Sequence, residues 1–471
     1  MSGLVQRFDV ELQPDPSRVI DRTLSFGALP DGSSRAAAIA GRVLALPEQT
    51  VGTLLAGLLA QFGERHDHLE QQLLDRAADL EQHVGGHALS EDRQMLLGAV
   101  FTAEYAVEAA ALCNPSAVLH PDRSGLPDGQ ERLAVSLRGV GEGHVSSIGF
   151  VEALVGPGPQ WSFVPRGRPL AQGVVAPGRW RREHLAAVLQ HTGLLTTVVQ
   201  QLVEGLPEQS SSDDVEAALE GHDEARRVAA SSYRRCFDDV ELSRRVLFPT
   251  APDERAGMED ARFVRCTDDD GGVEYRATYT AYDGKRILPR LITSPDLATF
   301  TTHRLAGPAS TNKGMALFPR RVGGRHLALC RSDGETTSLT SSDDGFTWDT
   351  PHAVLPPAHP WELVQVGNCG SPIETEHGWL VLTHGVGPMR VYSIGAVLLD
   401  LDDPSRVLRR LDAPLLQPGP DEQEGYVPHV VYSCGGIVHD GRLWLPYGVG
   451  DVRVRVAHVE LDALLSAMTA G

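Results

Sequence analysis

The sequence predicts a mainly β fold, because short strand-like runs recur through its second half and turns rich in Asp and Gly separate them. Evenly spaced short strands of this kind are typical of a sandwich, a barrel or a propeller. The clearest runs are Tyr275–Tyr282, Arg286–Ser294, His326–Arg331, Trp379–His384, Ile394–Leu399 and Arg442–Tyr447.

Two turns support the propeller among these three architectures. Ser341–Trp348 fits the pattern S-x-D-x-G-x-T-W, in which Ser and Asp side chains bind the backbone of the turn and Trp packs beneath it. Thr293–Phe300 is a degenerate copy of the same turn. The separation of the two copies matches the length of one propeller blade, about 40–50 residues.

The chain before these strands has a different pattern. Residues 1–46 mix short strand-like pieces with turn formers. Leucines at helical spacing then predict helices from Pro47 onward, with a stop at Gly85-Gly86 and a second helix from Glu91 to about Leu112. Helical periodicity returns at 179–206 and 215–246. We therefore expect a largely helical N-terminal region, 1–112, and a β domain, 113–471, with a helical insertion at about 179–246.

Composition narrows the class of protein. The net charge of −20 argues against nucleic acid or an anionic membrane as the main partner. Residues 1–7 lack the apolar core of a signal peptide, and no run has the roughly 20 apolar residues that span a bilayer. The six cysteines are scattered singly, which predicts reduced thiols in a cytoplasmic protein. The sequence leaves the oligomeric state open, a homo-oligomer included.

Gly257–Arg262 (GMEDAR) is the stretch with the strongest chemical signature, because it sets two acids and an arginine just before a strand-like run. A carboxylic acid acts as a general acid only when its surroundings aim it and keep it protonated. The glycine before the acids and the guanidinium after them are means of aiming. Taken alone, the stretch is more simply explained as a surface turn containing a local ion pair.

Further motifs decide between these interpretations, because together with Gly257–Arg262 they resemble the signature of glycoside hydrolase family 130. They keep the order of that family from Asn114 to Asp451. The similar stretches are Asn114–Ser116, Ser136–Arg138, Tyr279–Gly284, Asn312–Pro319, Gly378–Val386, Leu398–Pro404 and Pro446–Asp451.

The resemblance implies a five-bladed β-propeller with its active site at the central mouth, and activity on β-mannosides. Most members of that family are inverting phosphorylases, and a subset are β-1,2-mannosidases. By resemblance, Asp260 is the general acid, which passes its proton through a sugar hydroxyl, and Glu259 and Arg262 orient it. The resemblance also implies a phosphate site of Asn114, Arg138, Lys313, His384 and Tyr392, and sugar contacts from Asp283, Arg331, Arg390 and Asp451.

Phosphorolysis and hydrolysis make different demands on such a site. Phosphate arrives as an anion, so it needs cations and hydrogen-bond donors rather than a second carboxylate to activate water. Lys313 and His384 therefore favour phosphorolysis to α-mannose 1-phosphate, with phosphate as co-substrate and no cofactor. Hydrolysis stays open, because several glutamates are available as a base. These are Glu142, Glu335, Glu374 and Glu376.

Other functional classes were weighed beside these two. A non-catalytic glycan-binding propeller would explain the repeated turns but has no need of Asp260 among cationic groups. A retaining glycosidase of the sialidase type needs an arginine triad that the sequence does not assemble. Asp268–Gly272 is calcium-like in composition only and predicts a hairpin tip. Trp361 and Tyr426 could stack on a sugar ring, although packing in the core is the simpler interpretation of each.

Overall fold

The computed structural model describes residues 3–28, 32–80 and 88–470, and the chain divides into two compact units. The smaller unit comprises Asp15–Val107 and Gly167–Ala171. The larger unit comprises the residues up to Pro14, Glu108–Arg166 and the chain from Gln172 onward. Gly85 and Gly86, the predicted helix stop, lie outside the described residues.

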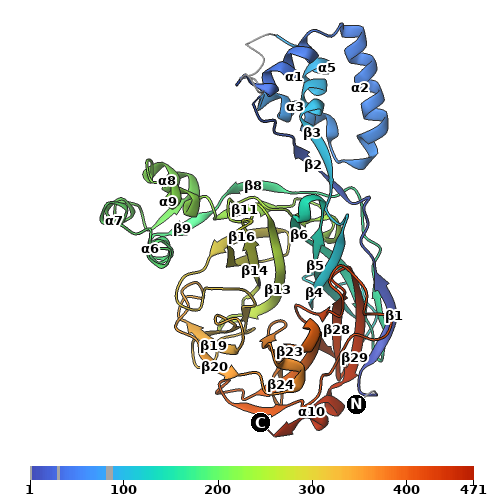
Figure 1. Ribbon diagram of the computed structural model, residues 1–471, viewed down its shortest axis with the longest axis vertical. Helices are drawn as coiled ribbons and strands as arrows, with labels where there is room; N and C mark the ends of the chain where they lie inside the picture. Colours follow the sequence, from blue (N-terminus) through green and yellow to red (C-terminus); the bar gives the residue numbers. More distant parts are fainter. Residues whose placement is uncertain (1–2, 29–31, 81–87, 471) are drawn as a thin grey trace. The chain divides into compact units, whose positions relative to one another are not determined.

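The smaller unit contains helices packed on one another and one strand pair (Figure 1). Its core includes Ile39, Val51, Leu97 and Phe101. Helices α3 and α5 approach so closely at Gly98 that a Cβ there would meet the Leu73 carbonyl oxygen at 1.9 Å. The elements are α1 (Arg35–Leu44), α2 (Glu48–Phe62), α3 (Leu69–Ala78), α5 (Glu91–Val100) and the antiparallel pair β2 (Val19–Thr23) and β3 (Thr102–Ala106).

The helix predicted from Glu91 to Leu112 is therefore wrong beyond Val100. Residues Thr102–Ala106 pair with β2 instead, and the next strand begins at Ala111. Ala111–Val118 are all buried, so tertiary burial and strand pairing override the helix-favouring Ala, Leu and Glu composition. Among the described residues no single helix is both long and apolar enough to cross a membrane. Helices α1 and α2 reach that length and composition only as a pair bent by 109°.

The larger unit is built of antiparallel sheets (Figure 1), so the prediction of a mainly β fold is confirmed. The first two sheets are linked by a single parallel bridge, Gly257↔Ser146. The first contains β4 (Ala111–Leu119), β5 (Glu131–Val140), β6 (Ser146–Val155), β7 (Trp161–Phe163) and β12 (Val246–Leu247). The second contains β13 (Gly257–Thr267), β14 (Val273–Tyr282), β15 (Ile287–Ser294), β16 (Thr299–Arg304), β11 (Tyr233–Cys236) and β8 (Val174–Pro177).

Three further sheets follow in chain order, and the last of them takes its outer strand from the start of the chain. The third contains β17 (Ala316–Leu317), β18 (His326–Cys330), β19 (Thr337–Ser342) and β20 (His352–Leu355). The fourth contains β21 (Gln365–Asn368), β22 (Ile373–Thr375), β23 (Gly378–Val386), β24 (Tyr392–Leu399), β25 (Val407–Arg410) and β30 (Thr469–Ala470). The fifth contains β26 (Val431–Tyr432), β27 (Ile437–His439), β28 (Arg442–Val449), β29 (Arg453–Glu460) and β1 (Gln6–Leu12).

The two repeated turns have the predicted construction at positions 48 residues apart. Asp344 accepts hydrogen bonds from the backbone N–H groups of Phe346 and Thr347, and Trp348 is buried beneath the turn. In the second sheet Asp296 accepts from Ala298 and Thr299 in the same way. The predicted hairpin tip at Asp268–Gly272 is also present, because the Asp268 carboxylate accepts from the N–H of Gly272.

Helices in the larger unit gather beside β8, β9 and β11 (Figure 1). They are α6 (Arg182–His191), α7 (Thr197–Glu204), α8 (Ser212–Ala218) and α9 (Asp223–Ala229), with a short strand pair β9 (Arg179–Arg181) and β10 (Gln209–Ser211). The helical prediction fails after Ala229, because Tyr233–Cys236 pairs with β16 and Val246–Leu247 pairs with β6. One further helix, α10 (Leu461–Ala467), follows β29.

Candidate active site

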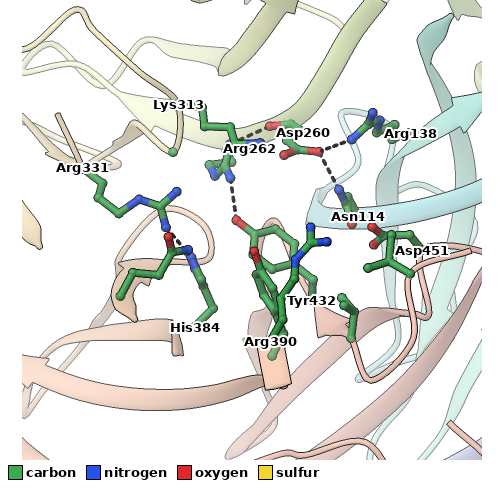
Figure 2. Close-up of a pocket in the computed structure, with 15 residues that line it drawn as sticks. Asn114, Arg138, Asp260, Arg262, Lys313, Arg331, His384, Arg390, Tyr432 and Asp451 are labelled. Carbon is green, nitrogen blue, oxygen red and sulfur yellow. Dashed lines mark hydrogen bonds and ion pairs between the residues drawn. The ribbon is translucent and has the colours of Figure 1, made fainter. Parts of the chain in front are cut away.

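A pocket in the larger unit gathers charged and polar side chains from four of the five sheets and from the loops between strands (Figure 2). Its wall contains five cationic side chains and two carboxylates, together with amide, imidazole and phenol groups. The lining residues are Asn114, Arg138, Asp260, Arg262, Lys313, Gly314, Arg331, Gln365, His384, Arg390, Tyr392, Val427, Val430, Tyr432 and Asp451.

Two β-bulges turn side chains into this pocket. In β13 the pairing with β14 shifts between Glu259 and Arg262, so Asp260 and Ala261 together oppose one residue. The pairing of β4 with β5 shifts in the same way around Asn114. A bulge re-aims side chains and is frequent beside active sites. Asp260 and Asn114 both have positive φ, 53° and 50°, which is a strained conformation for residues other than glycine.

Asp260 is held by two residues from the first sheet. The Asn114 amide donates to its Oδ1 over 2.5 Å, and the Arg138 guanidinium donates to the same oxygen over 3.3 Å. Arg138 also donates to Glu259 over 2.6 Å, so it bridges the two neighbouring acids. Burial alone would raise the pKa of Asp260, but Arg138, Arg262 and Lys313 outweigh it and lower the pKa to about 2.

Arg262 fixes the backbone on which Asp260 stands. Its buried guanidinium donates to the carbonyl oxygens of Asp260 (2.9 Å) and Cys369 (2.8 Å) and to the Tyr432 hydroxyl (2.8 Å). This side chain thereby joins strands β13 and β26 and the residue that follows β21. Arg262 therefore holds the backbone of Asp260, and its charge also favours the ionised form of that residue.

The opposite wall of the pocket contains Arg331, His384 and Tyr392. Arg331 donates to Nε2 of His384 over 2.7 Å, and the His384 ring stacks on Tyr392 with 6.2 Å between the ring centroids. Two further cations, Lys313 and Arg390, have no ion-pair partner in the described parts of the chain. Unpaired cations beside phenol and guanidinium donors form a site for an anion.

Asp451 is the second carboxylate of the lining. It sits in the turn between β28 and β29 with a φ of 52°, and it makes no hydrogen bond or ion pair with the described residues. Burial raises its pKa to about 6, and the charge of Asp260 adds to this effect, while Arg138 and Arg390 oppose it. The pocket thus holds two carboxyl groups whose pKa values differ widely.

Ten of the twelve residues predicted for the site line this one pocket. The other two are Glu259 and Asp283. Glu259 does not line the pocket, and it is paired with Arg138. Asp283 is a correction to the predicted sugar contacts: its carboxylate closes a turn by accepting from the N–H groups of Lys285 and Arg286, and it does not line the pocket.

The structure gives different answers for Trp361 and Tyr426, the two aromatic residues considered for stacking on a sugar ring. Trp361 packs so closely on two glycines of the fourth sheet that a Cβ at Gly385 or Gly395 would meet its ring at about 2.4–2.5 Å. Its indole donates to the Asp412 carbonyl, so packing is the correct interpretation. Tyr426 is 60% exposed, so packing in the core is wrong for this residue.

Five lining residues were not predicted: Gly314, Gln365, Val427, Val430 and Tyr432. Gly314 stands inside the predicted stretch Asn312–Pro319, which was a signal for it. Tyr432 acts through a hydrogen bond to Arg262 that no local pattern encodes. Within residues 3–28, 32–80 and 88–470, no group of three or more His, Cys, Asp or Glu side chains is arranged to hold a metal ion.

Known proteins resemble the half of the chain that contains most of this pocket. A family model described as beta-1,4-mannooligosaccharide phosphorylase matches residues 239–470. A 1,2-beta-oligomannan phosphorylase of Thermoanaerobacter sp. (strain X514) is 35% identical over 229 residues, which are 47% of this chain and 74% of the relative. A beta-1,2-mannobiose phosphorylase of the same organism is 34% identical over 242 residues, 50% of this chain and 78% of the relative.

One solved structure can be compared with the chain over a longer stretch. It is the complex of the beta-1,2-mannobiose phosphorylase of Listeria innocua with beta-1,2-mannobiose. The two are 20% identical with a TM-score of 0.47, over 77% of this chain and 92% of that chain. Asn114 and Arg138, which hold Asp260, stand before the segment that the family model matches.

Proposed function

Because the chain belongs to glycoside hydrolase family 130, whose members are glycoside phosphorylases and hydrolases acting on β-mannosides, we propose that it cleaves a β-mannoside by inverting phosphorolysis. The products are α-mannose 1-phosphate and the sugar that leaves. Asp260 is the general acid of this reaction, and inorganic phosphate is the nucleophile. The enzyme uses no cofactor.

The observation that carries the proposal is the charge balance of the pocket. Its lining contains five cations, Arg138, Arg262, Lys313, Arg331 and Arg390, but only two carboxylates. Arg262 and Arg138 are committed to Asp260. Lys313 and Arg390 keep their charges free, and Arg331 stands beside them. Phosphate carries close to two negative charges, and such a cluster positions and neutralises it.

Hydrolysis would instead need a carboxylate that deprotonates water. None of Glu142, Glu335, Glu374 and Glu376 is among the lining residues. Glu374, for example, is held by Arg320 in an ion pair of 2.5 Å. Asp451 is the one lining carboxylate besides Asp260, and it is therefore the base that a hydrolase on this scaffold would use.

The mechanism must also explain how Asp260 obtains a proton. With three cations around it, Asp260 is a carboxylate in the free enzyme at neutral pH. Phosphate bound beside Lys313 cancels part of this positive charge, and its own negative charge also raises the pKa of Asp260. In the proposed mechanism Asp260 takes up its proton in the complex with both substrates, where the anion beside Lys313 favours the neutral acid. It gives the proton to the leaving oxygen, through a sugar hydroxyl, as phosphate attacks the opposite face of the anomeric carbon.

The decisive experiment incubates β-1,2- and β-1,4-mannobiose with the enzyme, with and without phosphate, and follows the products by proton and phosphorus NMR. Phosphate-dependent formation of α-mannose 1-phosphate supports the proposal. Release of mannose that ignores phosphate assigns hydrolysis. Asp260→Asn should lower turnover by at least about 100-fold while leaving the thermal midpoint near that of the wild type. Binding of mannobiose without any turnover would instead support a non-catalytic glycan-binding protein.

We also propose that the five successive sheets of the larger unit are the five blades of a propeller. Each contributes an inner strand or an adjoining loop residue to the pocket, and β1 completes the last sheet beside β29. We propose a helical N-terminal region within 1–112 and a propeller over 113–471 that contains the helical insertion, with β1 from the first part added to the last sheet. All six cysteines are free thiols, which supports a location in the cytoplasm.

A further inference from the structure

Two five-residue loops on different sheets have the same backbone conformation. Gly141–Val145 joins β5 to β6, and Gly387–Val391 joins β23 to β24. The first glycines have φ/ψ of −106°/−159° and −104°/−165°, and the closing valines have −74°/121° and −71°/118°. Each loop is closed by a hydrogen bond from the N–H of the glycine to the carbonyl of the valine, 3.1 Å and 3.0 Å long.

The similarity of the two loops shows that His144 corresponds in position to Arg390. The fourth residue of each loop has a positive φ, 60° at His144 and 59° at Arg390. The residues six positions earlier, Arg138 and His384, also correspond, since each lies two residues before the last strand pair of its hairpin. Arg138, His384 and Arg390 all line the pocket (Figure 2). His144 therefore occupies the matching place at the rim of the first sheet.

Tyr426 contacts this histidine although the two residues are far apart in the sequence. Its ring centroid is 5.6 Å from that of His144, the planes are inclined by 31°, and its hydroxyl is 3.4 Å from Nδ1. The side chain is 60% exposed, and the next residue, Val427, lines the pocket. A single exposed aromatic residue needs no explanation. Here, however, the exposed ring lies tilted against His144, and the residue that follows it in the chain lines the pocket.

The loop that presents Tyr426 is fixed against the site. Gly425 packs so closely on Gly450 that a Cβ would meet the Gly450 carbonyl oxygen at 2.5 Å, and the N–H of Val427 donates to that oxygen over 2.9 Å. Earlier in the loop, buried Glu422 accepts a hydrogen bond of 2.6 Å from the Tyr447 hydroxyl. Gly450 directly precedes Asp451 of the pocket. The aromatic surface is thus held in place before any ligand arrives, which lowers the entropic cost of binding.

We propose that His144 and Tyr426 bind the sugar that leaves, so that they form the acceptor site at the mouth of the pocket; this rests on the proposed function. The interior of the pocket is charged, which suits phosphate and the reacting centre. The pair at the rim offers a flat apolar ring with a phenol and an imidazole at its edge. A neutral pyranose has a matching C–H face and hydroxyl rim, and tyrosine supplies such contact area at a low cost in side-chain entropy.

The test compares Tyr426→Ala, Tyr426→Phe and His144→Ala with the control Met389→Ala, which changes the 92% exposed third residue of the equivalent loop. In the synthetic direction, with α-mannose 1-phosphate as donor, Tyr426→Ala should raise the KM for the acceptor sugar about 10- to 30-fold, within the usual range for a stacked aromatic contact. The KM for the donor should change by less than about twofold. Tyr426→Phe should give a smaller rise, and Met389→Ala should match the wild type.

An unchanged acceptor KM in both alanine variants, or an equal rise in the donor KM, would overturn the assignment of this pair. If the wild type hydrolyses mannobiose instead, the same comparison is made on the KM for mannobiose. If the wild type cleaves no mannoside, the proposed function has failed by itself. Calorimetric titration of β-1,2- and β-1,4-mannobiose into the wild type and Tyr426→Ala then decides the rim site: weaker binding by the variant supports it, whereas equal binding, or none by either protein, overturns it.

Discussion

The guanidinium of Arg331 donates a hydrogen bond of 2.7 Å to Nε2 of His384. Arginine has donors but no acceptor, so this ring nitrogen carries a lone pair and the imidazole is neutral. Burial lowers the pKa of His384 well below its ordinary value, and the charges of Arg331 and Arg262 lower it further. His384 therefore adds no charge for phosphate. Its role is to hold the guanidinium of Arg331, which does supply a positive charge for phosphate.

Removing this acceptor should loosen the phosphate site. We expect His384→Ala to raise the KM for phosphate about 10- to 100-fold, because a hydrogen bond to a charged group is worth about 1.5–3 kcal/mol. The KM for the mannoside should change much less. His384→Gln, which keeps an acceptor, should recover part of the loss. Steady-state kinetics with each substrate varied in turn measures this, and equal rises in the two KM values would contradict it.

Phosphate binding should be accompanied by proton uptake at Asp260. In the free enzyme Arg138, Arg262 and Lys313 overcome the effect of burial and hold the pKa of Asp260 at about 2. Phosphate bound at Lys313 offsets the charge of that cation and raises the pKa of Asp260. The complex therefore holds more protons than the free enzyme, and its affinity increases as the pH falls. Isothermal titration of phosphate in two buffers with different ionisation enthalpies measures the uptake. Asp260→Asn is the control, because its proton uptake reports the protonation of phosphate itself and can be subtracted from that of the wild type. The same uptake in both proteins would contradict the linkage.

The part of the site that could be predicted lies in local motifs. Asn114, Arg138, Asp260 and Lys313 each stand in a short stretch that resembles a family motif, and that resemblance implied that they share one site. What no local pattern encodes is contact across sheets. Tyr432 and Arg262 are 170 residues apart, and only the folded chain brings the phenol to the guanidinium.

The errors have a similar cause. Asp283 precedes a glycine at the end of a strand, where an aspartate serves the turn backbone as readily as it serves a ligand. The helix expected through Leu112 ends at Val100 because the following segments find strand partners. Local propensity is a weak guide wherever a distant strand can satisfy the backbone and bury the side chains.

Asp451 should make the larger unit less stable as the pH rises. Burial raises its pKa from 3.8 to about 6, with a contribution from Asp260. Between these two pH values the folded protein keeps the proton while the unfolded chain has lost it, so this residue's contribution to stability falls as the pH rises through that window. Asp451→Asn removes the titration. We expect its thermal midpoint to exceed that of the wild type by a margin that grows from pH 4 to pH 6.5. A margin independent of pH would contradict the assigned shift.

Glu254 should be the acid whose loss most harms folding of the strand that carries Asp260. It is fully buried, accepts from the hydroxyls of Tyr233 and Tyr279 and from Arg290, and its carbonyl accepts from the N–H of Gly257, where β13 begins.

Glu254→Ala leaves the buried guanidinium of Arg290 without this partner, and breaking such a pair costs about 3–5 kcal/mol. We therefore expect a clear fall in the urea midpoint of the transition that unfolds the larger unit. The urea midpoint of Glu254→Gln should fall less, because the amide oxygen still accepts hydrogen bonds. Glu376→Ala changes an acid whose side chain is 87% exposed, so it should stay within about 0.5 kcal/mol of the wild type. A loss in Glu254→Ala no larger than in Glu376→Ala would show that the buried network does not stabilise this strand.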